Sequence, residues 1–78
     1  MFIALTNDKS DRIHSINIFH ITDFTLDDCD INKTNIFVVD QPYAIVVKED
    51  YNTVFHKINQ AKEEYYQALE GKRRLPHL

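Results

Sequence analysis

The chain of 78 residues has few of the residues on which many small folds and sites depend: one cysteine, one glycine, two prolines and no tryptophan. The single cysteine, Cys29, excludes an intramolecular disulfide and a four-cysteine zinc site, and it favours a reducing compartment. The only glycine is Gly71, so there is no glycine-rich loop that could hold a phosphate group. These absences exclude disulfide-stabilised domains and glycine-rich nucleotide sites.

Long hydrophobic runs are also missing. Nothing in the sequence approaches the roughly 20 apolar residues of a membrane span. Phe2–Leu5 is too short for the apolar core of a signal peptide and has no basic residues before it. We therefore expect a cytoplasmic protein without a membrane partner. Its many Asn, Ile, Lys and Asp residues are typical of an AT-rich coding sequence, which points to a bacterial or phage source.

The charge is unevenly distributed. Residues 1–40 hold seven acidic and three basic residues, whereas the whole chain has a net charge of −3. Three of the nine basic residues stand together as Lys72, Arg73 and Arg74, within a basic tail predicted for residues 72–78. An acidic body argues against nucleic-acid binding as the main task, so this tail is the candidate for any such binding.

The clearest structural signal lies between Asp50 and Arg74. Apolar residues recur there at steps of three and four, as on one face of an α-helix: Tyr51, Val54, Phe55, Ile58, Ala61, Tyr65, Ala68 and Leu69. Asp50 is the predicted N-cap, and Gly71 is predicted to end the helix in a left-handed conformation. The helix would then have about 20 residues and a length of roughly 30 Å.

Such a helix is longer than the strands that precede it, since strands of this kind span about 17–20 Å. We expect the Ala61–Leu69 end to extend beyond the domain, with Tyr65, Tyr66 and Leu69 as interface residues. The alternative is a frayed, solvated helix end. A thin core in a chain of this size also favours support from oligomerisation, and we expect a homodimer.

Four segments before the helix are predicted to form strands. Phe2–Thr6 is short, and Arg12–Phe24 is interrupted by a bulge or turn near Asn17–His20, although a helical turn over Ile18–Asp23 is an alternative. After a polar loop at Thr25–Thr34, Asn35–Asp40 and Tyr43–Lys48 form a hairpin. Gln41-Pro42 suits the favoured two-residue turns poorly, which favours a longer turn over Asp40–Tyr43.

Strands followed by one long helix indicate an α+β fold with a small antiparallel sheet, in a single domain over residues 1–71. The predicted core unites alternate strand positions with the apolar side of the helix. Its members are Ile3, Leu5, Ile16, Phe37, Val39, Ile45, Val47, Val54, Phe55 and Ile58.

Two short segments resemble the FlbD-type proteins linked to flagella and swarming. Ile16-Asn17-Ile18-Phe19-His20-Ile21 is similar to an Ile-Asn-x-x-x-Ile segment of that family. Val46-Val47-Lys48-Glu49, followed by Val54, Phe55 and Ile58, is similar to the end of its hairpin and its helix. The resemblance covers roughly residues 2–58 and departs from the family at Gln41-Pro42, where the family has Asn-Gly. It implies no catalytic residue.

No catalytic, cofactor or metal site is predicted. Asp28-x-Asp30-x-Asn32 resembles the start of a calcium-binding loop, but Lys33 and Val39 stand where glycine and glutamate are needed, so a solvated acidic loop is favoured. His14, His20, His56 and Cys29 have no spacing that is diagnostic of a metal or nucleophile site.

The leading hypothesis is a non-enzymatic, homodimeric module that binds an unknown protein partner. One alternative is a nucleic-acid-associated regulator that uses the basic tail, which would show salt-dependent binding. Another is a phage or mobile-element inhibitor whose acidic surface occupies a partner's basic site.

Overall fold

The computed structural model describes the backbone of residues 1–73 and the side chains up to Gly71. Its elements in chain order are β1 (Phe2–Thr6), β2 (Ile13–Asn17), the 3₁₀ helix η1 (Ile18–His20), β3 (Ile21–Leu26), β4 (Thr34–Val38), β5 (Ile45–Val47) and α1 (Tyr51–Arg73). The α+β class is confirmed. There are five strands in two antiparallel sheets instead of four strands in one, because the predicted Arg12–Phe24 segment divides into β2 and β3.

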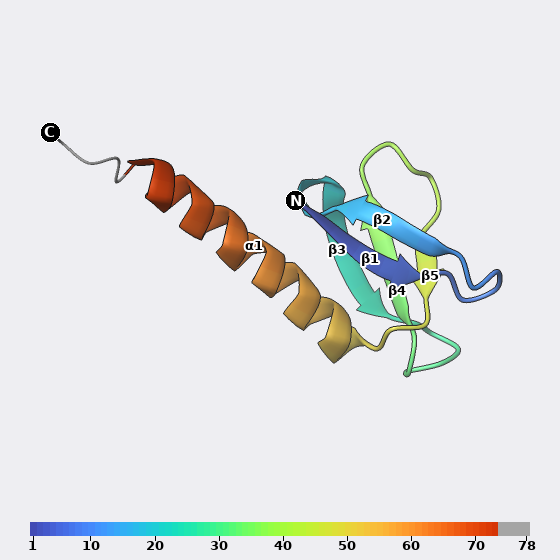
Figure 1. The fold of residues 1–78 in the computed structure, drawn as a ribbon. Coiled ribbons are helices and arrows are strands. Elements are labelled where there is room, and N and C mark those ends of the chain that lie inside the picture. The colour runs from blue at the N-terminus through green and yellow to red at the C-terminus, as the bar shows by residue number, and fades with distance from the viewer. Residues whose placement is uncertain (74–78) are drawn as a thin grey trace, which may run out of the picture.

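The two sheets meet along β5. β1 pairs only with β2 in one sheet, while β3, β4 and β5 follow one another in the second sheet. At the end of β1, the Lys48 N–H donates to the Thr6 carbonyl at 2.9 Å and the Asp8 N–H donates to the Val46 carbonyl at 3.0 Å. The sheets therefore form a curled body, and α1 runs past it and out to one side (Figure 1).

The predicted interruption near Asn17–His20 is confirmed as a short helical turn, whereas the alternative turn over Ile18–Asp23 is too long, because Ile21–Asp23 belong to β3. η1 occupies Ile18–His20, and the Asn17 side chain accepts a hydrogen bond from the Phe19 N–H at 3.0 Å. A short polar side chain at this position satisfies a backbone donor that no strand could pair. The turn carries the chain from one sheet to the other.

The connection between β4 and β5 is longer than the predicted turn. β4 ends at Val38 and β5 begins at Ile45, so the turn includes all of the predicted Asp40–Tyr43 segment. Asp40 has a φ of 61°, a left-handed conformation that Asp tolerates better than most residues. The proline at position 42 thus lies in a loop where its missing N–H has no cost.

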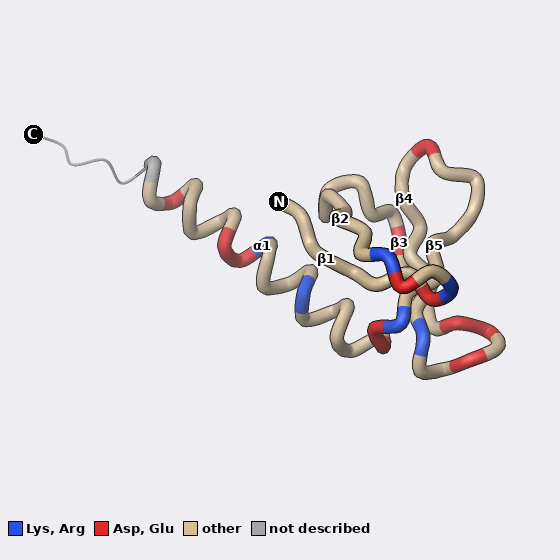
Figure 2. Tube along the Cα trace, turned by 45° about the vertical axis from the view of Figure 1, so that its right-hand side comes forward, with Lys and Arg blue, Asp and Glu red and all other residues tan. Residues whose placement is uncertain are grey.

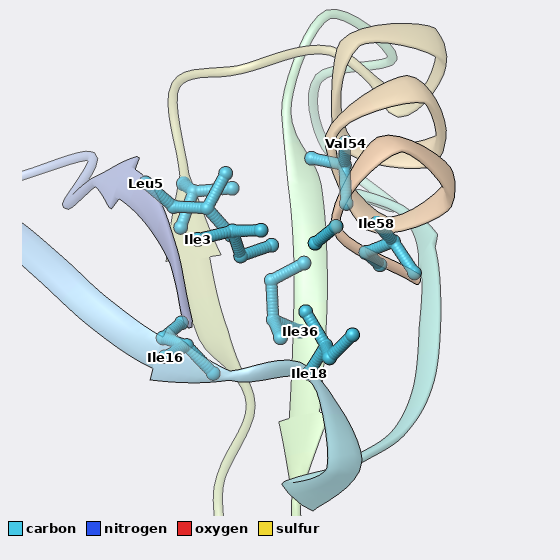
Figure 3. Packing of buried hydrophobic residues seen from close by; sticks show 9 residues of the cluster. Ile3, Leu5, Ile16, Ile18, Ile36, Val54 and Ile58 are labelled. Atoms are coloured by element: carbon cyan, nitrogen blue, oxygen red, sulfur yellow. The ribbon is translucent and has the colours of Figure 1, made fainter. Parts of the chain in front are cut away.

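The core lies between the two sheets and is closed by α1 (Figure 3). Six predicted members are buried: Ile3, Leu5, Ile16, Val47, Val54 and Ile58. Ile45 is half-buried and packs against them. The sequence prediction missed Ile18, Ile36, Ala61 and Thr34, which are also buried.

Phe37 and Val39 were predicted to be buried, and this is wrong because β4 has the opposite phase. Ile36 is fully buried, and with Thr34 it faces the core, whereas Phe37 and Val39 are exposed. Successive strand residues point to opposite faces, so a shift by one residue exchanges the whole set.

The predicted N-cap of α1 is confirmed, but the predicted end is wrong. Asp50 Oδ1 accepts a hydrogen bond from the Thr53 N–H at 2.8 Å. This interaction lowers the pKa of the Asp50 carboxyl, because hydrogen bonds from Thr53 stabilise its charged form. The helix continues through Gly71 to Arg73, and Gly71 does not take a positive φ.

Phe55 was also predicted to lie in the core, but 44% of its surface is exposed. The buried stripe of α1 consists of Val54, Ile58 and Ala61, a narrower set than the apolar residues of the sequence. A residue next to a buried one on a helix is turned by about 100° around the axis. Phe55 therefore lies beside the body and has its ring against His56, with the centroids 5.9 Å apart.

Polar contacts fix the start of α1 against β1. Both oxygens of Glu49 accept hydrogen bonds from Thr6, one from the N–H at 2.8 Å and one from the hydroxyl at 3.0 Å. Lys57 Nζ donates to the Ala4 carbonyl at 2.9 Å. The hydroxyl of the buried Thr34 donates to the Glu49 carbonyl at 2.8 Å. The outer edge of β1 is thus occupied by β5 and by side chains of the helix region.

Candidate protein-interaction surface

The C-terminal part of α1 extends away from the body (Figure 1). The predicted overhang began at Ala61, which is wrong, because only 7% of Ala61 is exposed. Tyr65 also reaches the body: its ring packs edge-on against Phe19 of η1, with the centroids 5.0 Å apart. The overhang therefore begins after Tyr65 and extends to Arg73, which corresponds to about 12 Å of helix.

Three rings form what we term the aromatic cluster, made of Phe19, Tyr65 and Tyr66. The rings of Tyr65 and Tyr66 meet edge-on with their centroids 5.7 Å apart. Phe19 is 52% exposed and Tyr66 is 57% exposed, while Tyr65 between them is half-buried. The structure thus brings two of the predicted interface residues together with one that the sequence analysis did not select.

Phe19 was missed because it belongs to a different segment. The signal for it was present in the sequence, since Phe19 departs from the alternation that Ile16 and Ile18 follow. In an alternating segment, an apolar residue out of phase with the buried positions is expected to point away from the core, and Phe19 does so from η1.

Leu69, the third predicted interface residue, lies one helical turn beyond the aromatic cluster and is half-buried. Ala68 and Gly71 are exposed beside it. The positions Ala61, Tyr65 and Leu69 continue the stripe that begins with Val54 and Ile58 at steps of three and four. The apolar stripe of α1 thus continues beyond the part of the helix that the body covers.

The predicted nucleic-acid residues cannot be placed next to this surface. Lys72 and Arg73 belong to the backbone of α1, but their side chains, and all of Arg74, lie outside the described residues. Acidic residues lie on α1 before and within the overhang, Glu63 and Glu64 ahead of Tyr65 and Glu70 beyond it (Figure 2). A phosphate backbone approaching here would meet these carboxylates.

The acidic loop between β3 and β4 uses its carboxylates within its own turn. Asp27 Oδ2 accepts hydrogen bonds from the N–H groups of Cys29 and Asp30, at 3.1 and 3.0 Å. Asp30 Oδ1 accepts from the Asn32 N–H at 2.9 Å. Local bonds of this kind are what shape such turns.

A lysine connects this loop to the β1–β2 turn. Lys33 Nζ lies 2.5 Å from Asp8 Oδ1 and 3.9 Å from Asp30 Oδ2. Its hydrogen bond to Asp8 raises the pKa of the Lys33 ammonium above its usual value. Acidic and basic residues therefore alternate in this region (Figure 2), and the acidic surface is partly neutralised by the chain itself.

Among the described residues, the three candidate histidines and the cysteine do not assemble into one site. Cys29 is exposed on the acidic loop, and His56 is exposed on α1. His14 and His20 line a common groove, and His14 Nε2 lies 3.1 Å from Asn7 Nδ2. Across residues 1–73 no three His, Cys, Asp or Glu side chains are placed to hold a metal ion.

The chain matches no family model, no curated protein and no solved structure. A search of the described helices for a long, apolar stretch able to cross a membrane finds none. Function has to be argued from the surfaces described above.

Proposed function

We propose that the protein is a non-enzymatic, cytoplasmic protein-binding module that forms a homodimer through the overhang of α1. The supporting observation is the apolar stripe that continues from the buried Ala61 through Tyr65 to Leu69, beyond the body of its own chain. Next to this stripe, the exposed rings of Phe19 and Tyr66 add apolar surface that faces water in a single chain. Tyrosine and phenylalanine are enriched in protein interfaces.

A second copy of the chain suits this surface. Two overhangs that cross about a twofold axis would place Leu69 and the aromatic cluster of each chain against the other, so every contact occurs twice. The apolar area removed from water stabilises such a pair by about 25 cal/mol per Å².

The resemblance to FlbD-type proteins is part of the same proposal. The two segments that carry it lie at structurally specific places: Asn17 caps η1, and Glu49 binds β1 at the start of α1. Both residues have defined structural roles in this chain, and the accessory, non-catalytic role that the resemblance implies agrees with the proposed protein-binding function.

The proposal is tested by the variant Tyr66→Glu with Leu69→Glu, analysed by sedimentation over about a hundredfold concentration range. Tyr65 is left unchanged because it contacts Phe19 of its own chain. The wild type should dimerise with rising concentration, and the double variant should be folded and more weakly associated or monomeric.

The matched control is Gln60→Glu with Gln67→Glu, which adds the same charge at exposed polar positions of α1. It should behave like the wild type. A wild type that stays monomeric at every concentration would exclude the dimer. A double variant that dimerises as well as the wild type would exclude the overhang as its interface.

A further inference from the structure

One edge of the smaller sheet is open. Pairing between β1 and β2 follows one register, which includes Ile3 opposite Ile16 and Leu5 opposite His14. The Asn7 N–H donates to Arg12 at one end of this ladder, and the Ile18 N–H donates to Met1 at the other. In an antiparallel pair, hydrogen-bonded and non-bonded positions alternate.

This alternation determines where each backbone group of β2 points. The bonded positions of β2 are His14 and Ile16, so Ile13, Ser15 and Asn17 direct their N–H and C=O groups away from β1. Among the described residues, β2 has no partner strand other than β1. The outer edge of β2 therefore offers a row of donors and acceptors at the spacing of a strand.

The edges of β1 and β3 have neighbours of different kinds. The outer edge of β1 is bonded by Lys48, Glu49 and Lys57. β3 lies against the start of α1, where the rings of Phe24 and Tyr51 are 5.0 Å apart. The edge of β2 differs from that of β3 by the larger hollow beside it.

A groove of about 520 Å³ runs along this open edge. One wall is β2, and the other is formed by the end of β4, the β4–β5 loop and β5. Its apolar lining consists of Phe2, Ile16, Val38, Val39 and Ile45. A second hollow of about 370 Å³ shares His14, Gln41 and Ile45 with it and extends it toward the β1–β2 turn.

The lining of the main groove contains polar side chains, including Ser15, Asn17 and Gln41, but no Asp, Glu, Lys or Arg. Apart from His14 and His20, which also line the groove, a charged segment would find no ionisable side chain there, whereas an apolar one would be covered on both sides. Sheets bind extended peptides through two features, a row of unpaired backbone groups and apolar pockets beside it.

We propose that this groove binds an extended, apolar segment of another protein, which adds to β2 as a further strand. Backbone groups of the segment pair with Ser15 and Ile13, and its alternate side chains enter the lining formed by Ile16, Val38 and Ile45. This inference rests on the proposed protein-binding function and names the class of partner. The groove is separate from the overhang of α1, so each surface can be tested without the other.

A second copy of β2 is the other strand that could pair here. This pairing is disfavoured because the second copy would bring its own β1 together with its β2. The wall formed by residues 38–41 limits the space into which both strands would have to fit. A single segment does not meet this obstacle.

The experiment selects binders from a displayed library of random decapeptides and measures their affinity for the wild type and variants. The enriched peptides should be apolar, alternating and free of proline. On binding, they should slow hydrogen exchange at the Ser15 N–H and shift the amide signals of Ser15 and Val39.

Ser15→Pro removes the outward N–H and leaves the bonds between β1 and β2 in place, because proline is tolerated at a strand edge. It should weaken binding about tenfold or more, since a backbone hydrogen bond is lost and the ring blocks the approach. Ser15→Ala keeps the N–H and is the matched control, with unchanged affinity expected.

Val39→Glu tests the other wall without touching β2. It places a charge in the apolar lining and should also weaken binding about tenfold. Ile31→Glu, at a residue that is exposed on the acidic loop, is its matched control. This pair decides the question if Ser15→Pro does not fold.

Three results would overturn the proposal. The first is a selection that yields no peptide perturbing the β2 amides, and the second is a folded Val39→Glu variant that binds as well as the wild type. The third is self-association of the wild type that Ser15→Pro abolishes without peptide, because β2 would then pair with a second copy. A peptide site that survives Tyr66→Glu with Leu69→Glu would support the groove even if the overhang proved not to dimerise.

Discussion

The two halves of α1 are continuous in the backbone and differ in what surrounds them. The first half, from Tyr51 to Ala61, has its apolar stripe buried against both sheets, with Val54 fully covered. The second half, from Tyr65 to Arg73, repeats apolar residues at the same period, but beyond Tyr65 none of the described strands lies against it. Periodicity alone thus identifies a helix and an apolar face without identifying what the face contacts.

The difference shows where the stability of the helix comes from. Most helical stability in proteins derives from packing of an apolar face rather than from propensity. The first half has that packing, together with the cap at Asp50 and the contacts of Glu49 and Lys57. The second half has good helix-forming residues and, in our proposal, obtains its packing from a second chain.

Truncating one apolar side chain in each half of α1 should give the largest difference in the free energy of unfolding. Ile58→Ala should lower the free energy of unfolding by about 2–5 kcal/mol, because Ile58 is buried in the core that α1 closes. Leu69→Ala should change the stability of the single chain by less than about 0.5 kcal/mol, as expected for a surface position. Urea unfolding at low protein concentration measures both.

Phe55→Ala is the control for this comparison. Phe55 is next to the buried stripe but exposed, so its truncation should cost clearly less than that of Ile58. Equal losses at Phe55 and Ile58 would contradict the orientation of α1 described above.

The anchoring of the first half can be broken at the junction between β5 and α1. Glu49→Ala removes the acceptor for both the N–H and the hydroxyl of Thr6, and hydrogen bonds to a charged group are worth about 1.5–3 kcal/mol. We expect a loss in this range by urea unfolding. Thr6→Val completes a double-mutant cycle, in which the two changes should not be additive.

Glu63→Ala is the matched control, since Glu63 is exposed on α1. Its stability should equal that of the wild type. Additive effects of Glu49→Ala and Thr6→Val would show that the two side chains do not interact.

The sequence predicted the fold correctly where a local pattern is compatible with only one structure. The period of Val54 and Ile58, the capping role of Asp50 and the interruption before Ile21 follow from neighbouring residues alone. The run from Ile36 to Val39 is apolar throughout, so its composition is compatible with either phase, and pairing with β3 and β5 decides it. For the same reason Phe55 was assigned to the core, since the width of the buried stripe depends on the surface against which it packs.

The candidate surfaces show the same limit. Tyr65, Tyr66 and Leu69 were predicted from helix length, a local property, but Phe19 joins them only through the packing of η1 against α1. The groove beside β2 depends on which strand remains unpaired, and that is a property of topology. The contact of Glu49 with Thr6 likewise connects residues 43 positions apart, which no local pattern reveals.

The smallest expected effect concerns the first residue before α1. Hydrogen bonds from Thr53 lower the pKa of Asp50 below its reference value of 3.8, so the charged carboxylate is favoured in the folded state. A group with a depressed folded-state pKa contributes stability above its unfolded-state pKa, and the contribution is lost as the pH falls through the folded-state value.

Asp50→Asn keeps a good N-cap but does not titrate. The melting temperature of the wild type should therefore exceed that of Asp50→Asn near about pH 7, and the difference should shrink below about pH 3.8. Thermal unfolding followed by circular dichroism between about pH 7 and pH 2.5 measures this difference, with Asp28→Asn in the acidic loop as the charge-matched control. A difference that is constant over this range would show that the cap does not depend on the charge of Asp50.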